Sequence, residues 1–80
     1  MPHMALIRKF DHIPKDVTRV HGEVECGYTV FETGGHRYLQ LDTYGSPERE
    51  RPGRTSQTIQ LNESAARELI ALLRRAFPEN

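Results

Sequence analysis

The chain has 80 residues and equal numbers of basic and acidic side chains, eleven of each, which argues against a protein held to nucleic acid by bulk positive charge. Hydrophobic residues make up 36% and Trp is absent, which is low for a self-sufficient core but too high for a disordered chain. A domain of this size hides only about 60 to 65 per cent of its unfolded surface, so we expect burial against a second copy.

The single cysteine, Cys26, excludes an intramolecular disulfide and fits a reducing, cytoplasmic compartment. We expect neither a signal peptide nor a membrane span, and we interpret residues 1–3 as a cloning remnant before one domain over residues 4–80.

The first half of the chain predicts short strands. "MALIRKF" at residues 4–10 predicts a strand that ends before Pro14, and the chain is expected to be extended again from Val17. In the stretch from residue 22 onward, apolar and polar residues alternate with period two, which is typical of a half-buried strand. "TGG" at residues 33–35 then supplies a tight turn, and residues 36–44 resume as a second strand, so a hairpin is predicted.

The second half predicts a loop, a strand and a helix. "GSPERERPG" at residues 45–53 is bounded by Gly and Pro, so it is expected to be an exposed connection. "RTSQTIQL" at residues 54–61 predicts the next strand, and Asn62 is a strong candidate for the N-cap of a helix that ends before Pro78. The predicted fold class is therefore α+β, an antiparallel β-β-β-β-α arrangement with a curved sheet and one C-terminal helix.

The predicted helix carries an apolar arc of roughly 160 degrees, wider than a surface helix needs. One flank of the arc can cover the chain's own sheet, and the spare part predicts a homodimer interface at Ala65, Leu69, Leu72, Leu73 and Ala76. A wider intramolecular groove is the alternative interpretation.

One stretch also resembles a known family. "YLQLDTYGSPERERPGRTSQTIQLNESAARELI", and above all "PGR" followed by a strand running into "LN", is similar to the C-terminal domain of the transcriptional coactivator PC4 family over about half of the chain. The resemblance implies a PC4-like homodimer that binds single-stranded DNA in grooves formed by curved sheets, in transcription or in DNA repair or defence. It is compatible with a small bacterial or phage protein.

Binding of a single strand requires cations that follow the phosphates and flat rings on which bases stack. The predicted nucleic-acid-binding residues are Arg37, Tyr38, Tyr44, Arg49, Arg51, Arg54, Ser56, Thr58 and Gln60. Arg54, Ser56, Thr58 and Gln60 form a polar ladder that could donate to phosphate oxygens, and Arg49 and Arg51 could close over the strand. Charge-alternating runs such as the one around Arg49 and Arg51 are usually solvated loops with weak ion pairs, and a tyrosine such as Tyr44 near a strand end is often a core cap.

Catalytic and metal-binding patterns are not found in the sequence. The four histidines are scattered, Cys26 stands alone, and no glycine-rich phosphate loop precedes the helix. We therefore expect a non-enzymatic protein without cofactor or metal, whose partners are single-stranded nucleic acid and a second copy of itself. The alternative is a small protein-interaction or regulatory subunit that uses the same sheet to bind a partner protein.

Overall fold

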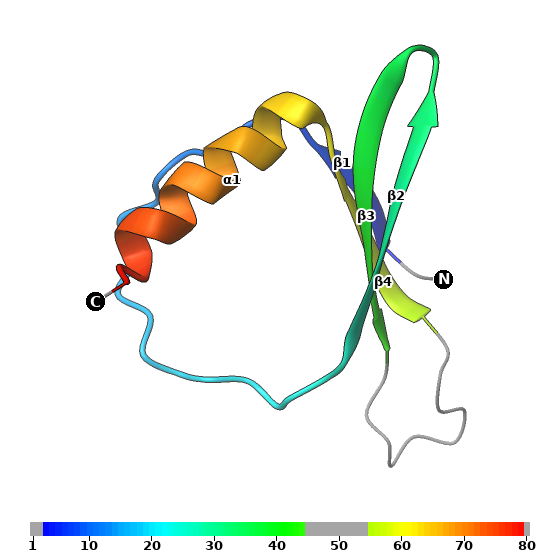
Figure 1. Ribbon diagram of the computed structural model, residues 1–80. Helices are drawn as coiled ribbons and strands as arrows, with labels where there is room; N and C mark the ends of the chain where they lie inside the picture. Colours follow the sequence, from blue (N-terminus) through cyan, green and yellow to red (C-terminus); the bar gives the residue numbers. More distant parts are fainter. Residues whose placement is uncertain (1–2, 45–54, 80) are drawn as a thin grey trace.

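The computed structural model describes residues 3–44 and 55–79, which form a four-stranded sheet and one helix (Figure 1). Strand β1 covers His3–Ile7, β2 covers Cys26–Thr33, β3 covers His36–Tyr44 and β4 covers Thr55–Leu61. Helix α1 covers Glu63–Ala76 and follows β4 after a single residue. The α+β class, the hairpin and the C-terminal helix predicted from the sequence are confirmed.

The sheet is mixed, with strand order β1-β4-β3-β2, so the prediction of a fully antiparallel sheet is wrong for β1. Strands β2, β3 and β4 pair antiparallel, whereas β1 pairs parallel with β4, with Ala5 opposite Ile59 and Ile7 opposite Leu61. Strand β1 also runs in the same direction as β2, its next strand along the chain, so the connection between them must be long enough to return along the sheet. Residues 8–25 supply that length, and they carry no strand although an extended segment was predicted there from Val17.

The β2–β3 hairpin has its register fixed by its turn. Gly34 and Gly35 have φ angles of 60° and 79°, a left-handed conformation that glycine adopts without steric cost. The turn places Thr33 opposite His36 and Phe31 opposite Tyr38. Because side chains alternate along a strand, every later pair of the hairpin is assigned to one face of the sheet by this turn.

The paired strands give the sheet two chemically different faces. One side, called here the apolar face, carries Ala5 and Ile7 of β1, Ile59 and Leu61 of β4, Leu39 and Leu41 of β3, and Tyr28 and Val30 of β2. The opposite side, called here the polar face, carries Met4, Leu6, Gly27, Thr29, Phe31, Tyr38, Gln40, Asp42, Thr58 and Gln60. The sheet therefore presents polar and aromatic groups on the side opposite its aliphatic rows.

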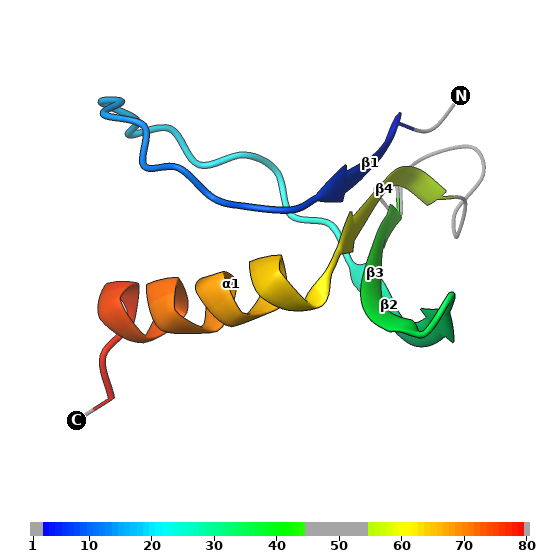
Figure 2. The same ribbon diagram turned by 90° about the horizontal axis from the view of Figure 1, so that it is seen from above.

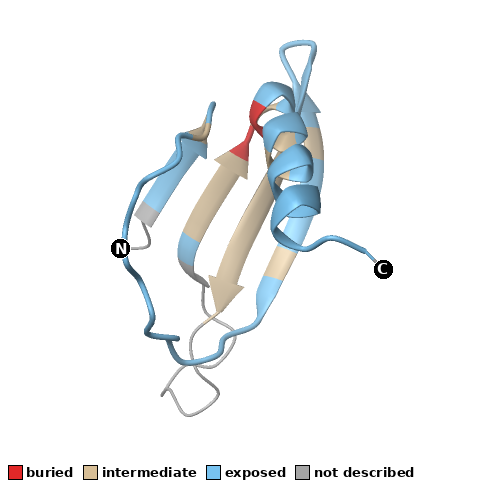
Figure 3. Cartoon of the chain, turned by 90° about the vertical axis from the view of Figure 1, so that its left-hand side faces the viewer, coloured by how far each residue is buried: buried red, intermediate tan, exposed pale blue. Residues whose placement is uncertain are grey.

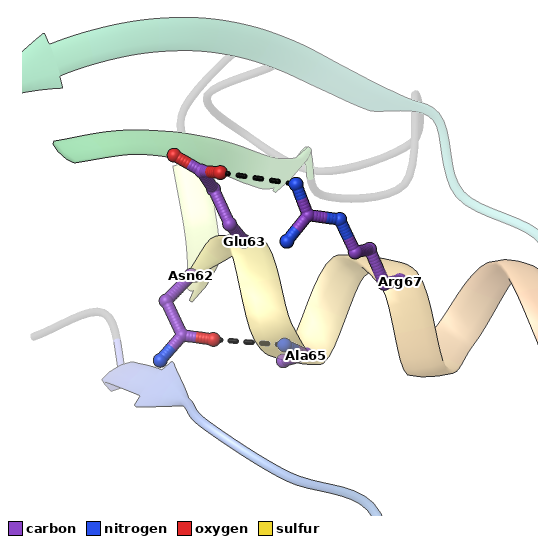
Figure 4. Close-up of polar contacts among 4 residues, drawn as sticks. All are labelled: Asn62, Glu63, Ala65 and Arg67. Atoms are coloured by element: carbon purple, nitrogen blue, oxygen red, sulfur yellow. Dashed lines mark hydrogen bonds and ion pairs between the residues drawn. The ribbon is translucent and has the colours of Figure 1, made fainter.

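The helix begins at the residue that the sequence indicates. The side chain of Asn62 accepts a hydrogen bond from the backbone N–H of Ala65 at 2.8 Å (Figure 4). Glu63 lies in the first turn, where the helix dipole favours an anion, and forms an ion pair with Arg67 at 3.4 Å. At the other end Phe77 closes the helix with a backbone bond to the carbonyl of Leu73.

We expect Asn62→Ala to lower the free energy of unfolding by about 1 kcal/mol, because the first helical turn loses its side-chain acceptor. Urea unfolding followed by circular dichroism measures this change. Ser64→Ala, in the same exposed turn, is the matched control and should leave stability within about 0.5 kcal/mol. Equal effects of the two substitutions would contradict the capping role.

The buried core of the described residues is very small. Only Leu61 and Ala65 are buried, at the point where β4 passes into α1 (Figure 3). Leu39, Leu41 and Ile59 are half-buried, and the helix contacts β3 and β4 near its start. The rest of α1 projects away from the sheet, with residues 8–25 on the same side of the sheet (Figures 1 and 2).

Two hydrogen bonds connect the segment after β1 to the helical part of the chain. The backbone N–H of Asn62 donates to the carbonyl of Ile7 at 3.4 Å, and the N–H of Phe10 donates to Glu68 Oε2 at 3.1 Å. These bonds fix the start of the crossover segment beside α1. The apolar arc of the helix is therefore only partly used within one chain.

Candidate nucleic-acid interface

A chain of hydrogen bonds crosses the centre of the polar face. Gln60 Nε2 donates to Gln40 Oε1 at 2.8 Å, and Gln40 Nε2 donates to Asp42 at 3.3 Å to Oδ1 and 3.1 Å to Oδ2. From the neighbouring strand the hydroxyl of Thr58 donates to Asp42 Oδ1 at 2.7 Å. Gln60 thus donates to Gln40, and both Gln40 and Thr58 donate to Asp42. The series of bonds ends at the Asp42 carboxylate, a negatively charged acceptor at the centre of the polar face.

These bonds also set the ionisation of the carboxylate. The hydroxyl of Thr58, and after it the amide of Gln40, hold the pKa of Asp42 below its ordinary value of 3.8, against a weaker opposing effect of burial. Because the folded pKa lies below the unfolded one, this contribution to stability is fully present above the unfolded value and is lost as the pH falls through the folded pKa. Asp42 is therefore charged at neutral pH.

We expect Thr58→Val to raise the pKa of Asp42, because the isosteric side chain removes the hydroxyl that contributes most to the shift. An NMR titration of the side-chain carboxyl carbon measures it. Thr29→Val, on the same face of β2, is the control and should leave the titration unchanged. An Asp42 pKa that is the same with and without the Thr58 hydroxyl would show that the bond does not form in solution.

Aromatic rings lie on the same face. The rings of Phe31 and Tyr38 are stacked, with centroids 5.4 Å apart and planes 24° from parallel. The two residues face each other across the hairpin, and each side chain is half-buried. This stacked pair of rings, called here the Phe31–Tyr38 platform, lies next to Gln40 on the polar face, and each ring covers part of the other.

The third ring belongs to Tyr44, beyond the irregularity in the β3–β4 pairing at Thr43 and Tyr44. A Cβ atom placed on Gly27 would meet the Tyr44 hydroxyl at 2.6 Å and its ring carbons at 3.3 and 3.4 Å. Tyr44 therefore lies over Gly27, and Gly27 is the partner of Asp42 across the strands. A side chain at residue 27 would collide with the Tyr44 hydroxyl, so the glycine allows Tyr44 to occupy this position.

Two hollows adjoin these groups. One, of about 390 Å³, is lined by Met4, Ala5, Leu6, Gln40, Thr58 and Gln60, and no helix residue borders it. The other, of about 430 Å³, lies at the start of β3 and of α1, and its lining includes Tyr38, Arg37 and Arg67 together with Glu63, the ion-pair partner of Arg67. One end of the aromatic and polar surface thus adjoins two cations.

The structure brings some of the predicted site residues together and separates others. Tyr38, Tyr44, Thr58 and Gln60 lie on the polar face, and Ser56 lies within β4. Arg37 belongs by alternation to the side opposite Tyr38, and it pairs with Glu32 at 3.4 Å. Thr58 and Gln60 donate to Asp42 and Gln40, so the Thr58 hydroxyl hydrogen and one N–H of Gln60 are used within the sheet. Arg49, Arg51 and Arg54 lie outside the described residues.

The predicted dimer residues also differ in their exposure. Ala65 is fully buried within its own chain, so it has no surface to offer a second copy. Leu69 is half-buried, whereas Leu72, Leu73 and Ala76 are exposed. Sequence reasoning left out Ile70 and Phe77, which are exposed on the same helix.

Sequence reasoning also left out four residues of the polar face, namely Gly27, Phe31, Gln40 and Asp42. The two-glycine turn fixes the hairpin register, and this register alone would have placed Phe31 opposite Tyr38 and Gly27 opposite Asp42. The bonds from Gln60 and Thr58 depend on the long-range pairing of β3 with β4. No local pattern in the sequence specifies that register.

Comparisons with protein families, curated proteins and solved structures give no match for this chain. Within residues 3–44 and 55–79, no three His, Cys, Asp or Glu side chains are grouped so that they could hold a metal ion. The described helix is too short and too polar to cross a membrane.

Proposed function

We propose that the chain binds single-stranded nucleic acid, with DNA preferred, through the polar face of the sheet, as a non-catalytic homodimer acting in transcription or in DNA repair or defence. The observation that carries the proposal is the series of rings on that face. The Phe31–Tyr38 platform and the ring of Tyr44 lie on either side of the polar groups of Gln40 and Asp42. Membership of the PC4 family is part of the same proposal and is supported by the sequence resemblance.

Rings and amides in this arrangement suit unpaired bases. Stacking of one base on an aromatic side chain contributes about 1 to 3 kcal/mol, whichever base it is, and an unpaired base also exposes its hydrogen-bonding edge. Tyr38 and Tyr44 are six residues apart on one strand, which corresponds to about 20 Å. The two platforms therefore contact separate nucleotides of one strand.

The phosphates of a bound strand need cations nearby. The negative charge of Asp42 keeps phosphates away from the centre of the polar face. Arg37 and Arg67 border the hollow next to Tyr38, so the backbone of the bound strand passes that end of the sheet. The connection that contains Arg49, Arg51 and Arg54 joins β3 to β4 at the end where Tyr44 lies. In this arrangement bases contact the face, and phosphates follow its two ends.

The homodimer is supported by the surface that one chain leaves uncovered. The chain exposes 7500 Å². A compact protein of 9.2 kDa exposes about 4,900 Å². The radius of gyration is 14.9 Å, against about 11.6 Å for a compact domain of this length. A second copy that covered part of this excess would form an interface in which folding and association are coupled.

Two apolar surfaces are available for this contact. Ile70, Leu73 and Phe77 form one exposed stripe of α1, and they are 50%, 44% and 73% exposed. Tyr28 and Val30 form an exposed row on the apolar face of β2, at 76% and 57%. The helix stripe of one copy covers the β2 row of the other, which leaves the polar face of both sheets open to solvent.

The test is a salt titration of binding to a labelled oligonucleotide, followed by fluorescence anisotropy. The logarithm of the affinity should fall linearly with the logarithm of the salt concentration, with a slope of about 0.7 per phosphate contacted. Arg67→Gln should lower the slope by about one such contact, whereas Arg19→Gln, in the exposed segment before β2, should not change it. A salt-independent affinity, or no binding at low salt, would overturn the proposal.

A protein partner is the second candidate. Met4 and Leu6 are 72% and 51% exposed on the polar face of the edge strand β1, and they favour an apolar contact there. The two candidates differ in the salt titration, because a protein partner that contacts Met4 and Leu6 predicts no oligonucleotide binding.

A further inference from the structure

We propose that Asp42 makes the polar face selective for guanine over thymine, an inference that rests on the proposed binding of single-stranded nucleic acid. The selectivity arises from the direction of the hydrogen bonds. Within the described part of the chain, Gln60 donates to Gln40, Gln40 donates to Asp42, and Thr58 donates to Asp42. A base edge that approaches this carboxylate meets its two acceptor oxygens.

The carboxylate retains acceptor capacity on both oxygens. An ionised Asp has about four lone-pair positions. Thr58 occupies one on Oδ1 at 2.7 Å, and the single Nε2 of Gln40 is shared between Oδ1 and Oδ2. Two parallel donors from a ligand can therefore still be accepted, in the bidentate manner in which carboxylates bind planar donor pairs.

Guanine is the base whose edge fits this group. Its ring N1–H and exocyclic amine are adjacent donors on the Watson–Crick edge, so they match the two oxygens of a carboxylate. Thymine offers a single N–H between two carbonyl oxygens, and those oxygens would face the negative charge. Adenine and cytosine each offer one amine as a donor, so their affinity for the carboxylate should lie between those of guanine and thymine.

The platform for the base lies beside the carboxylate. Tyr44 lies over Gly27, and Gly27 is the cross-strand partner of Asp42. A guanine stacked on the Tyr44 ring directs its Watson–Crick edge along the sheet surface toward Asp42. The ring supplies affinity for any base, and the carboxylate supplies the preference.

The experiment compares a short oligothymidine with the same strand in which two non-adjacent thymines are replaced by guanine. Guanine should increase the affinity about 5- to 150-fold, which corresponds to one bidentate base contact. Inosine, which keeps the N1–H and lacks the amine, should give an intermediate affinity. This comparison requires no change in the protein.

Asp42→Asn should abolish most of the guanine preference, because an amide presents one acceptor and one donor in place of two acceptors. Its affinity for oligothymidine should not fall, since a negative charge is removed from the face. Asp16→Asn, an equal change of charge in the exposed segment before β2, should keep the preference.

The outcomes separate the two proposals. Equal affinity for the guanine and thymine strands, or a preference that survives in Asp42→Asn, would overturn the selectivity and leave the binding function intact. Failure of every oligonucleotide to bind at low salt would overturn both.

Discussion

Leu73→Glu should convert the proposed homodimer into a monomer that has lost most of its stable structure. Leu73 is the middle residue of the exposed helix stripe, with Ile70 on one side and Phe77 on the other. Each dimer contains two copies, and removing two buried leucine side chains costs about 3 to 6 kcal/mol, two to four powers of ten in the dimer dissociation constant. Burial of the new carboxylates adds to that cost.

Loss of structure follows from the small core of the single chain. Leu61 and Ala65 are the buried residues among those described, and an isolated sheet and helix with so little burial cannot offset the entropy of folding. Sedimentation equilibrium gives the mass, and circular dichroism gives the helix and strand content. Ser64→Glu introduces the same carboxylate on an exposed turn of the same helix and should leave a folded dimer. A folded monomer in the unmodified protein would refute the proposed interface.

Tyr38→Leu should weaken oligonucleotide binding by about 1 to 3 kcal/mol, or roughly 5- to 150-fold, because the stacked platform with Phe31 is lost. Tyr38→Phe keeps the ring and should bind nearly as well as the unmodified protein. Both variants should remain dimers, since the side chain is on the polar face and the proposed interface is on the apolar one. Fluorescence anisotropy gives the affinity, and a thermal melt verifies the fold. Equal affinities of the leucine and phenylalanine variants would show that no base stacks there.

Local signals in the sequence were sufficient for the hairpin and the helix. Two consecutive glycines specify a tight turn and its register, and Asn62 and Pro78 mark the two ends of the helix. Alternation along residues 36–44 separated Tyr38, Gln40 and Asp42 from Leu39 and Leu41, as the sheet does. These features depend on neighbours only a few residues apart.

The pairing of strands far apart in the chain could not be predicted from the sequence. "MALI" is apolar at every position, so no alternation indicates which side of β1 faces the core, and its parallel pairing with β4 spans most of the chain. Helical periodicity gave the width of the apolar arc, but it did not distinguish Ala65, which is buried by its own sheet, from Leu73, which is exposed. The acceptor role of Asp42 in β3 likewise depends on Thr58, which lies 16 residues later, in β4.

The central claim is that a single strand of nucleic acid lies on the polar face, and NMR titration with an oligonucleotide tests it most directly. We expect the side-chain amide signals of Gln40 and Gln60 and the ring signals of Tyr38 to move in proportion to bound ligand. The methyl signals of Val30 and Leu73, on the opposite face and on the helix stripe, should remain in place. Shifts confined to Val30 and Leu73, or none at saturating oligonucleotide, would contradict it.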